Sequence, residues 1–175
     1  GLVIEFQHSR LNPQERVARE IFYQNMVWVV DGTRLKRDYL RFLEGRKHIM
    51  TGHKKGFFLV HFPEECFPVS WIESSVMVIF DFQGTLPNNP QDEMRNILWC
   101  LLPGRAKNRA VMIAISRQDF VAAGMKQPQL LPEPAHELVR AYDKLLTEQE
   151  ETREQEQQQR WLNRRPHRRN IPRRR

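Results

Sequence analysis

Two polar side chains with metal-binding or water-positioning chemistry stand close to the start of the chain, in the segment LVIEFQH at residues 2–8. In a β-strand, side chains two positions apart point to the same face, so Glu5 and Gln7 share one face. A buried carboxylate needs a partner, and a divalent ion held by one or two carboxylates is one such partner. An ordinary strand with one solvated face fits the same pattern, so both interpretations stay open. The opposite face is apolar: Leu2, Ile4 and Phe6.

A helix is predicted from about Pro13 to Asn25, directly after this strand. Asn12 suits the N-cap and Pro13 the first helical position. Arg19 and Tyr23 lie one turn apart and therefore point the same way, toward either the Glu5 face or solvent. The apolar stripe expected to face the core consists of Val17, Ala18, Ile21 and Phe22.

The run GLVIEFQHSRLNPQERVAREIFYQNMVWVVDG at residues 1–32 resembles the core of the CoiA-like competence nucleases, which belong to the PD-(D/E)XK superfamily. The family pattern is a strand with Glu-x-Gln, a His/Cys-Ser pair, a helix with Arg-x-x-x-Tyr, and a strand with Trp. The matching residues are Glu5, Phe6, Gln7, His8, Ser9, Arg19, Tyr23 and Trp28. The resemblance persists more weakly through 71–82 and 115–120 and ends before about residue 133.

This resemblance implies an α/β fold with a mixed central sheet flanked by helices, and Mg²⁺- or Mn²⁺-dependent cleavage of DNA linked to DNA uptake and recombination. It implies that Glu5 and the carbonyl of Phe6 bind the metal ion. Gln7 takes the place of the more usual lysine and orients the attacking water, because an amide cannot act as a general base. Arg19 or the metal ion supplies the missing positive charge, and Tyr23 lies one turn from Arg19 on the helix that faces the metal site in related nucleases.

The family's first acid, an Asp on the preceding strand, has no counterpart before Glu5. We therefore expect residues that precede Gly1, a nuclease domain that is truncated at its N-terminus, and little cleavage by residues 1–175 alone. The alternative is a nuclease-fold protein that binds nucleic acid through an Arg-rich C-terminal tail, without catalysis.

Positive charge is concentrated at the C-terminal end. Residues 160–175 hold eight of the 28 basic residues and no acidic one, whereas the formal net charge of the whole chain is +7. Arginine pairs with phosphate and stacks on bases, so this segment is predicted to be a disordered tail that binds nucleic acid. A merely solubilising end is the alternative. The candidate residues are Arg164, Arg165, Arg168, Arg169, Arg173, Arg174 and Arg175.

The remaining predicted helices and strands form the scaffold that positions the candidate site residues. We expect a helix at 34–45, a loop at 46–56, strands at 57–61, 76–82 and 110–115, a loop at 84–90, and helices at 91–102 and from Ser116 to Gly124. An amphipathic helix from about residue 133 continues into a Glu/Gln-rich extension to 160. These elements predict an α/β domain at 1–132, a helix at 133–160 and the tail at 161–175.

The sequence also argues against several classes of protein and of binding site. No apolar run approaches the roughly 20 residues of a membrane span, so no membrane partner is expected. Two widely spaced cysteines predict free thiols and a reducing, cytoplasmic compartment. The absence of a Gly-rich phosphate loop argues against a nucleotide cofactor. The scattered His48, His53, His61 and Cys66 match no standard zinc spacing.

Overall fold

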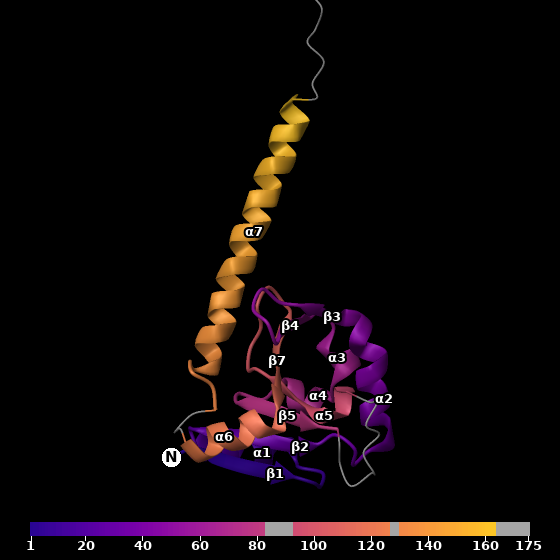
Figure 1. The fold of residues 1–175 in the computed structure, drawn as a ribbon, viewed down its shortest axis with the longest axis vertical. Coiled ribbons are helices and arrows are strands. Elements are labelled where there is room, and N and C mark those ends of the chain that lie inside the picture. The colour runs from indigo at the N-terminus through magenta and orange to yellow at the C-terminus, as the bar shows by residue number, and fades with distance from the viewer. Residues whose placement is uncertain (83–92, 127–129, 164–175) are drawn as a thin grey trace, which may run out of the picture.

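The computed structural model describes residues 1–82, 93–126 and 130–163, and its centre is a seven-stranded mixed sheet (Figure 1). The strands lie in the order β1-β2-β5-β6-β7-β4-β3. The first three of these are mutually parallel, and every later pair is antiparallel. The bounds are β1 Val3–Gln7, β2 Met26–Asp31, β3 Ile49–Thr51, β4 Phe57–Val60, β5 Met77–Asp81, β6 Ile97–Leu101 and β7 Ala110–Ser116.

Helices cover both faces of the sheet. One face packs against α2 (Lys36–Gly45), α3 (Pro63–Cys66) and α4 (Val69–Ile72), with α1 (Pro13–Phe22) over the parallel edge. The other face packs against α6 (Arg117–Lys126) and α7 (Ala135–Asn163), which Figure 1 shows on the far side from α2. The short η1 (Arg46–His48) and α5 (Glu93–Asn96) precede strands. The predicted α/β class with a mixed sheet flanked by helices is thus confirmed, as is the long C-terminal helix.

The parallel strands set the geometry of the candidate site. Each of β1 and β2 is followed by a helix, so the carboxyl ends of both strands and of β5 meet at one edge of the sheet. In the register of these strands, Glu5 lies beside Trp28, and Asp31 lies beside Asp81. Polar groups that are far apart in the sequence are therefore neighbours at this edge.

The expected helix at 91–102 is wrong. Of the described residues 93–102, only Glu93–Asn96 are helical, and residues Ile97–Leu101 form β6, which pairs with β5 and β7 in the sheet interior. The run ILWCL is apolar at every position because both faces of this central strand are covered. A continuous apolar run of this kind does not separate a buried strand from a buried helix.

The expected core-facing stripe of α1 is also wrong. Ile21 and Phe22 are 71% and 78% exposed, whereas Arg16 and Glu20 are each only 5% exposed. The helix therefore turns its charged side toward the sheet and its apolar side toward solvent. The charged side is stabilised there because every carboxylate oxygen of Glu20 has partners within the protein.

Three smaller differences concern boundaries and faces. The predicted loop at 46–56 contains the short edge strand β3, which pairs with β4. The helix α6 passes Gly124 and ends at Lys126. The helix α2 begins at Lys36, later than the expected residue 34, and it turns Tyr39 and Phe42 toward the core while Leu40 is 56% exposed.

The long helix α7 docks only through its first half. Leu138, Val139, Tyr142 and Leu146 pack on the sheet, while all side chains from 151 to 163 are exposed. The predicted Glu/Gln-rich helical extension is thus present. Within the described ranges, no helix has the length and apolar character needed to cross a membrane. The expected loop at 84–90 and the tail from residue 164 onward lie outside the described residues.

Candidate active site

The face of β1 that carries Glu5 and Gln7 is covered by α1. Gln7 is only 8% exposed, and the Glu5 side chain is 22% exposed. Asn12 starts α1 by accepting a hydrogen bond from the Gln14 N–H at 2.9 Å, which fixes the turn between strand and helix. The two polar side chains therefore lie between the sheet edge and a helix, as a strand with an alternating pattern predicts.

Arg19 joins two carboxylates at this position. One guanidinium nitrogen, Nη1, is paired with Glu5 Oε1, and the other, Nη2, is paired with Glu15 Oε1. The second oxygen of Glu5, Oε2, is buried and has no hydrogen-bond partner among the described residues. A buried carboxylate oxygen without a partner carries the full cost of its lost hydration. Glu5 Oε2 is therefore an acceptor that no described donor satisfies.

The backbone of β1 offers a further oxygen beside Glu5. The Val3 N–H donates to the Asn25 carbonyl on the β2 side, at 2.9 Å. Backbone groups alternate in direction along a strand, so the Phe6 carbonyl points to the outer edge of the sheet, away from β2. The Phe6 side chain is 60% exposed at that edge. A carboxylate oxygen and a carbonyl oxygen are hard ligands of the kind that Mg²⁺ and Mn²⁺ prefer, so the residues present fit such an ion.

The Gln7 side chain is held by the turn that follows β1. Its amide nitrogen donates to the Ser9 carbonyl at 2.8 Å and to the Ser9 hydroxyl at 3.0 Å. These two bonds fix the orientation of the amide, so the carboxamide oxygen is the end left to accept a hydrogen bond from water. Ser9 thus positions the Gln7 amide, a contact that residue spacing alone did not predict.

The structure brings together Glu5 and Arg19 but not Tyr23. The Tyr23 ring packs edge-on against Phe22 with a centroid separation of 4.9 Å, and Tyr23 is 39% exposed. Its backbone N–H closes the end of α1 by donating to the Arg19 carbonyl at 2.9 Å. Tyr23 therefore marks the end of the helix, and in the described part of the chain no hydrogen bond joins its hydroxyl to Glu5.

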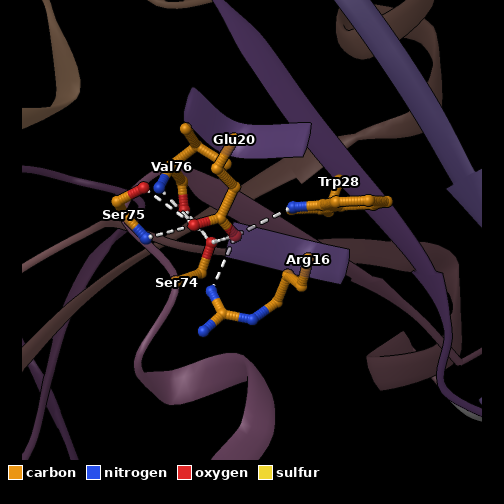
Figure 2. A network of polar contacts seen from close by, with 6 residues as sticks. All are labelled: Arg16, Glu20, Trp28, Ser74, Ser75 and Val76. Carbon is orange, nitrogen blue, oxygen red and sulfur yellow. Dashed lines mark hydrogen bonds and ion pairs between the residues drawn. The ribbon is translucent and has the colours of Figure 1, made fainter. Parts of the chain in front are cut away.

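The Glu20 carboxylate is the centre of a buried polar network that no pattern in the sequence indicated, and Figure 2 shows this network from close by. The Glu20 carboxylate accepts from Arg16 Nη1 at 2.7 Å and from the Trp28 indole N–H at 3.1 Å. It also accepts from the Ser74 hydroxyl at 2.8 Å and from the Ser75 backbone N–H and hydroxyl at 3.0 and 2.7 Å. Burial raises the pKa of Glu20, but the hydrogen bonds from Ser75, Ser74 and Arg16 outweigh it and hold the pKa below its usual value. The Glu20 network fixes α1, and with it Arg19, over β1.

Two aspartates end the neighbouring parallel strands. Asp31 accepts hydrogen bonds from the Thr33 backbone N–H at 2.9 Å and the Thr33 hydroxyl at 2.6 Å. Burial raises its pKa, but the Thr33 bonds and the nearby His8 hold the pKa below its usual value. Asp81 forms a bidentate ion pair with Arg117, at 2.5 and 2.6 Å. Both carboxylates are thereby engaged at the sheet edge.

The histidines and cysteines do not converge. His48 contacts Glu65 at 2.7 Å, His61 lies 3.0 Å from Met50 Sδ, and His53 contacts Gln149 at 2.7 Å. Cys66 and Cys100 are buried free thiols, as predicted, and burial raises the pKa of Cys66 to about 11. Within residues 1–82, 93–126 and 130–163, no group of three or more His, Cys, Asp or Glu side chains is arranged to hold a metal ion.

The arginine-rich segment is described only at its beginning. Arg160 lies on the exposed end of α7, where it pairs with Glu156 at 3.8 Å. The predicted nucleic-acid-binding residues that follow it lie outside the described residues: Arg164, Arg165, Arg168, Arg169, Arg173, Arg174 and Arg175.

Comparisons with protein-family models, with curated proteins and with solved structures gave no match for this chain.

Proposed function

We propose that this chain belongs to a Mg²⁺- or Mn²⁺-dependent DNA nuclease of the PD-(D/E)XK type, similar to the CoiA-like competence nucleases. The observation that supports the proposal best is Glu5, on a strand that is followed by a helix and a parallel strand: its buried Oε2 has no hydrogen-bond partner among the residues that the structure describes. The proposal also includes a role in DNA uptake and recombination, which rests on the resemblance over residues 1–32.

In this proposal Glu5 and the Phe6 carbonyl hold the metal ion. When bound, the ion supplies Lewis-acid chemistry: it acidifies water and neutralises charge that builds on the phosphodiester. Gln7 orients the attacking water through its carboxamide oxygen, because the amide nitrogen is held by Ser9. Arg19 leaves its pairs with Glu5 and Glu15 and turns its guanidinium toward the phosphate, where two parallel N–H donors match two phosphate oxygens.

One observation favours a second function, nucleic-acid binding without catalysis. Arg19 neutralises Glu5 and Glu15 at once, so both carboxylates are satisfied in part without a metal ion. In that case Glu5 is a structural partner of α1, and the protein binds DNA through its basic residues. The two functions make opposite predictions for the removal of Glu5.

Metal-dependent cleavage of plasmid and single-stranded DNA is the direct test, in the longest form of the protein that its gene encodes. Glu5→Ala is expected to abolish cleavage with Mg²⁺ or Mn²⁺ and to weaken Mn²⁺ binding measured by calorimetry. Glu44→Gln, at an exposed carboxylate on α2, is the control and should leave both unchanged. Undiminished cleavage by Glu5→Ala overturns the metal site, and DNA binding without any cleavage favours the second function.

The same assay separates the roles of Gln7. Gln7→Lys introduces the residue more usual in the superfamily, and we expect it to retain activity or to change its metal preference. Gln7→Leu has neither donor nor acceptor and should lower the cleavage rate about 100-fold, because the water is no longer oriented. Full activity of Gln7→Leu excludes a water-positioning role.

A further inference from the structure

A cavity of about 410 Å³, lined by both charged and apolar side chains, lies at the carboxyl ends of β1 and β2. Its walls come from the loop after β1, the loop after β2, the first turns of α1 and α2, and α4. In α/β sheets, the crevice outside the carboxyl ends of parallel strands is a common ligand position. Gln7 forms part of the wall, so the cavity adjoins the candidate active site without including Glu5.

Three arginines line this cavity: Arg10, Arg16 and Arg34. Arg10 and Arg34 are exposed at its mouth, whereas the Arg16 side chain is only 6% exposed. Arg16 Nη1 pairs with Glu20, as Figure 2 shows, but Arg16 Nε is buried and has no hydrogen-bond partner among the described residues. Arg16 also lines the cavity, so an anionic oxygen there adds a second negative partner to its buried guanidinium.

The residues that line the cavity besides the three arginines do not suit a simple anion such as phosphate. Asp31 and Asp38 also line the cavity, and they accept hydrogen bonds from donors but repel a bare phosphate. Leu11, Leu35 and Trp71 add apolar and aromatic surface. Burial raises the pKa of Asp38, although Arg41 and Arg34 oppose this effect. The matching ligand carries an anionic group at one end and a flat group with N–H or O–H donors at the other.

We propose that this cavity binds one nucleotide of a nucleic-acid strand, with its phosphate at Arg10, Arg16 and Arg34. The sugar or base donates to the aspartates and lies against the apolar wall, where stacking on aromatic surface tolerates different bases. The choice of a strand over a free nucleotide rests on the proposed function, because a strand in this cavity runs past Gln7 toward Glu5. The cavity thus acts as a subsite that fixes the strand beside the candidate active site.

Binding of a fluorescein-labelled six-nucleotide thymidine strand to the full chain tests the proposal by anisotropy. Arg34→Gln and Arg10→Gln should each weaken binding about tenfold, as expected for loss of a charge-assisted hydrogen bond. Arg37→Gln is the matched control, because Arg37 is an exposed arginine on α2 that does not line the cavity. It should change the affinity less than about twofold. Equal losses for Arg34→Gln and Arg37→Gln overturn the subsite and indicate diffuse charge attraction. Arg16 is left intact because it belongs to the Glu20 network.

Competition experiments distinguish binding of a nucleic-acid strand from binding of a free nucleotide or of inorganic phosphate. Unlabelled six-nucleotide strand should displace the probe at lower concentration than thymidine monophosphate, and thymidine monophosphate at lower concentration than inorganic phosphate. Phosphate that competes as well as the nucleotide overturns recognition of the sugar and base, and monophosphate that competes as well as the strand overturns the choice of a strand. Glu5→Ala should retain strand binding. Retained, Arg34-dependent binding in a protein that never cleaves DNA therefore refutes the proposed function alone, whereas cleavage that is insensitive to Arg34→Gln refutes the subsite alone.

Discussion

The indole N–H of Trp28 donates a hydrogen bond of 3.1 Å to the carboxylate of Glu20, beneath a helix whose apolar side faces solvent. Trp28 lies in the middle of β2, beside Glu5 of β1. The Glu20 carboxylate thus connects the strand next to the candidate site with the helix that carries Arg19. Because this contact is polar and buried, it fixes the position of α1 more narrowly than apolar packing would.

Removing the charge of Glu20 should destabilise the fold. Glu20→Gln leaves the Arg16 guanidinium buried without a counter-charge, which costs about 3–5 kcal/mol. Glu15→Gln on the same helix is the control and should cost less than about 1 kcal/mol, because Glu15 is exposed. Urea denaturation of the three proteins measures both values. A cost for Glu20→Gln as small as the control's contradicts the Glu20 network.

Acid should weaken the same network. The pKa of Glu20 in the folded chain is below its usual value, about 4.3 for a free glutamate. A lowered folded pKa contributes stability that is present above about pH 4.3 and is lost as the pH falls through the folded pKa. The difference in unfolding free energy between the natural chain and Glu20→Gln should therefore shrink on acidification from about pH 6 to about pH 3. A difference that is constant across this range contradicts the assigned pKa shift.

The apolar side of α1 should contribute little to the stability of the isolated chain. Ile21→Ser is expected to change the free energy of unfolding by less than about 0.5 kcal/mol, because Ile21 is 71% exposed. Leu138→Ala, at a leucine of α7 that is 6% exposed, should cost about 2–5 kcal/mol. A loss for Ile21→Ser in the range expected for Leu138→Ala would show that α1 is buried through its apolar side.

The arginine-rich segment should dominate the salt dependence of DNA binding. Each phosphate that it neutralises contributes about −0.9 to the slope of log K against log salt concentration on duplex DNA. Deletion of residues 160–175 removes eight arginines and should weaken binding and flatten this slope, while Mn²⁺ binding at Glu5 persists. Titrations at several salt concentrations measure both effects. Equal affinities and equal slopes show that these arginines do not contact DNA.

The sequence predicted the strand–helix–strand unit at the start of the chain because its signals are local. Asn12 and Pro13 mark the start of α1, and the alternation at Glu5 and Gln7 places both on one face. Which side of α1 is buried against the sheet could not be predicted from such local signals. Its charged side is buried because Ser74 and Ser75, more than 50 residues away, supply hydrogen bonds to Glu20. The amphipathic pattern shows that a helix has two faces, but distant partners decide which face is buried.

The candidate site could likewise be predicted only where its contacts depend on local sequence signals. The pairing of Glu5 with Arg19 follows from a strand and the helix after it. The cavity depends on Trp71 and on the turn after β2, which reach the end of β1 only through the topology of the sheet. The strand β6 was misread because a uniformly apolar run has no period to distinguish strand from helix.

The exposed half of α7 holds the end of the helix at a defined distance from the sheet. A helix rises 1.5 Å per residue, so Asn163 lies about 25 Å beyond Leu146, the last buried residue of α7. The end of the described helix is therefore held at a defined distance from the sheet. If both ends engage one duplex, this distance corresponds to about seven base pairs at 3.4 Å each. Once one end of the protein is bound to DNA, the effective concentration of its other end is raised at DNA positions about that distance away.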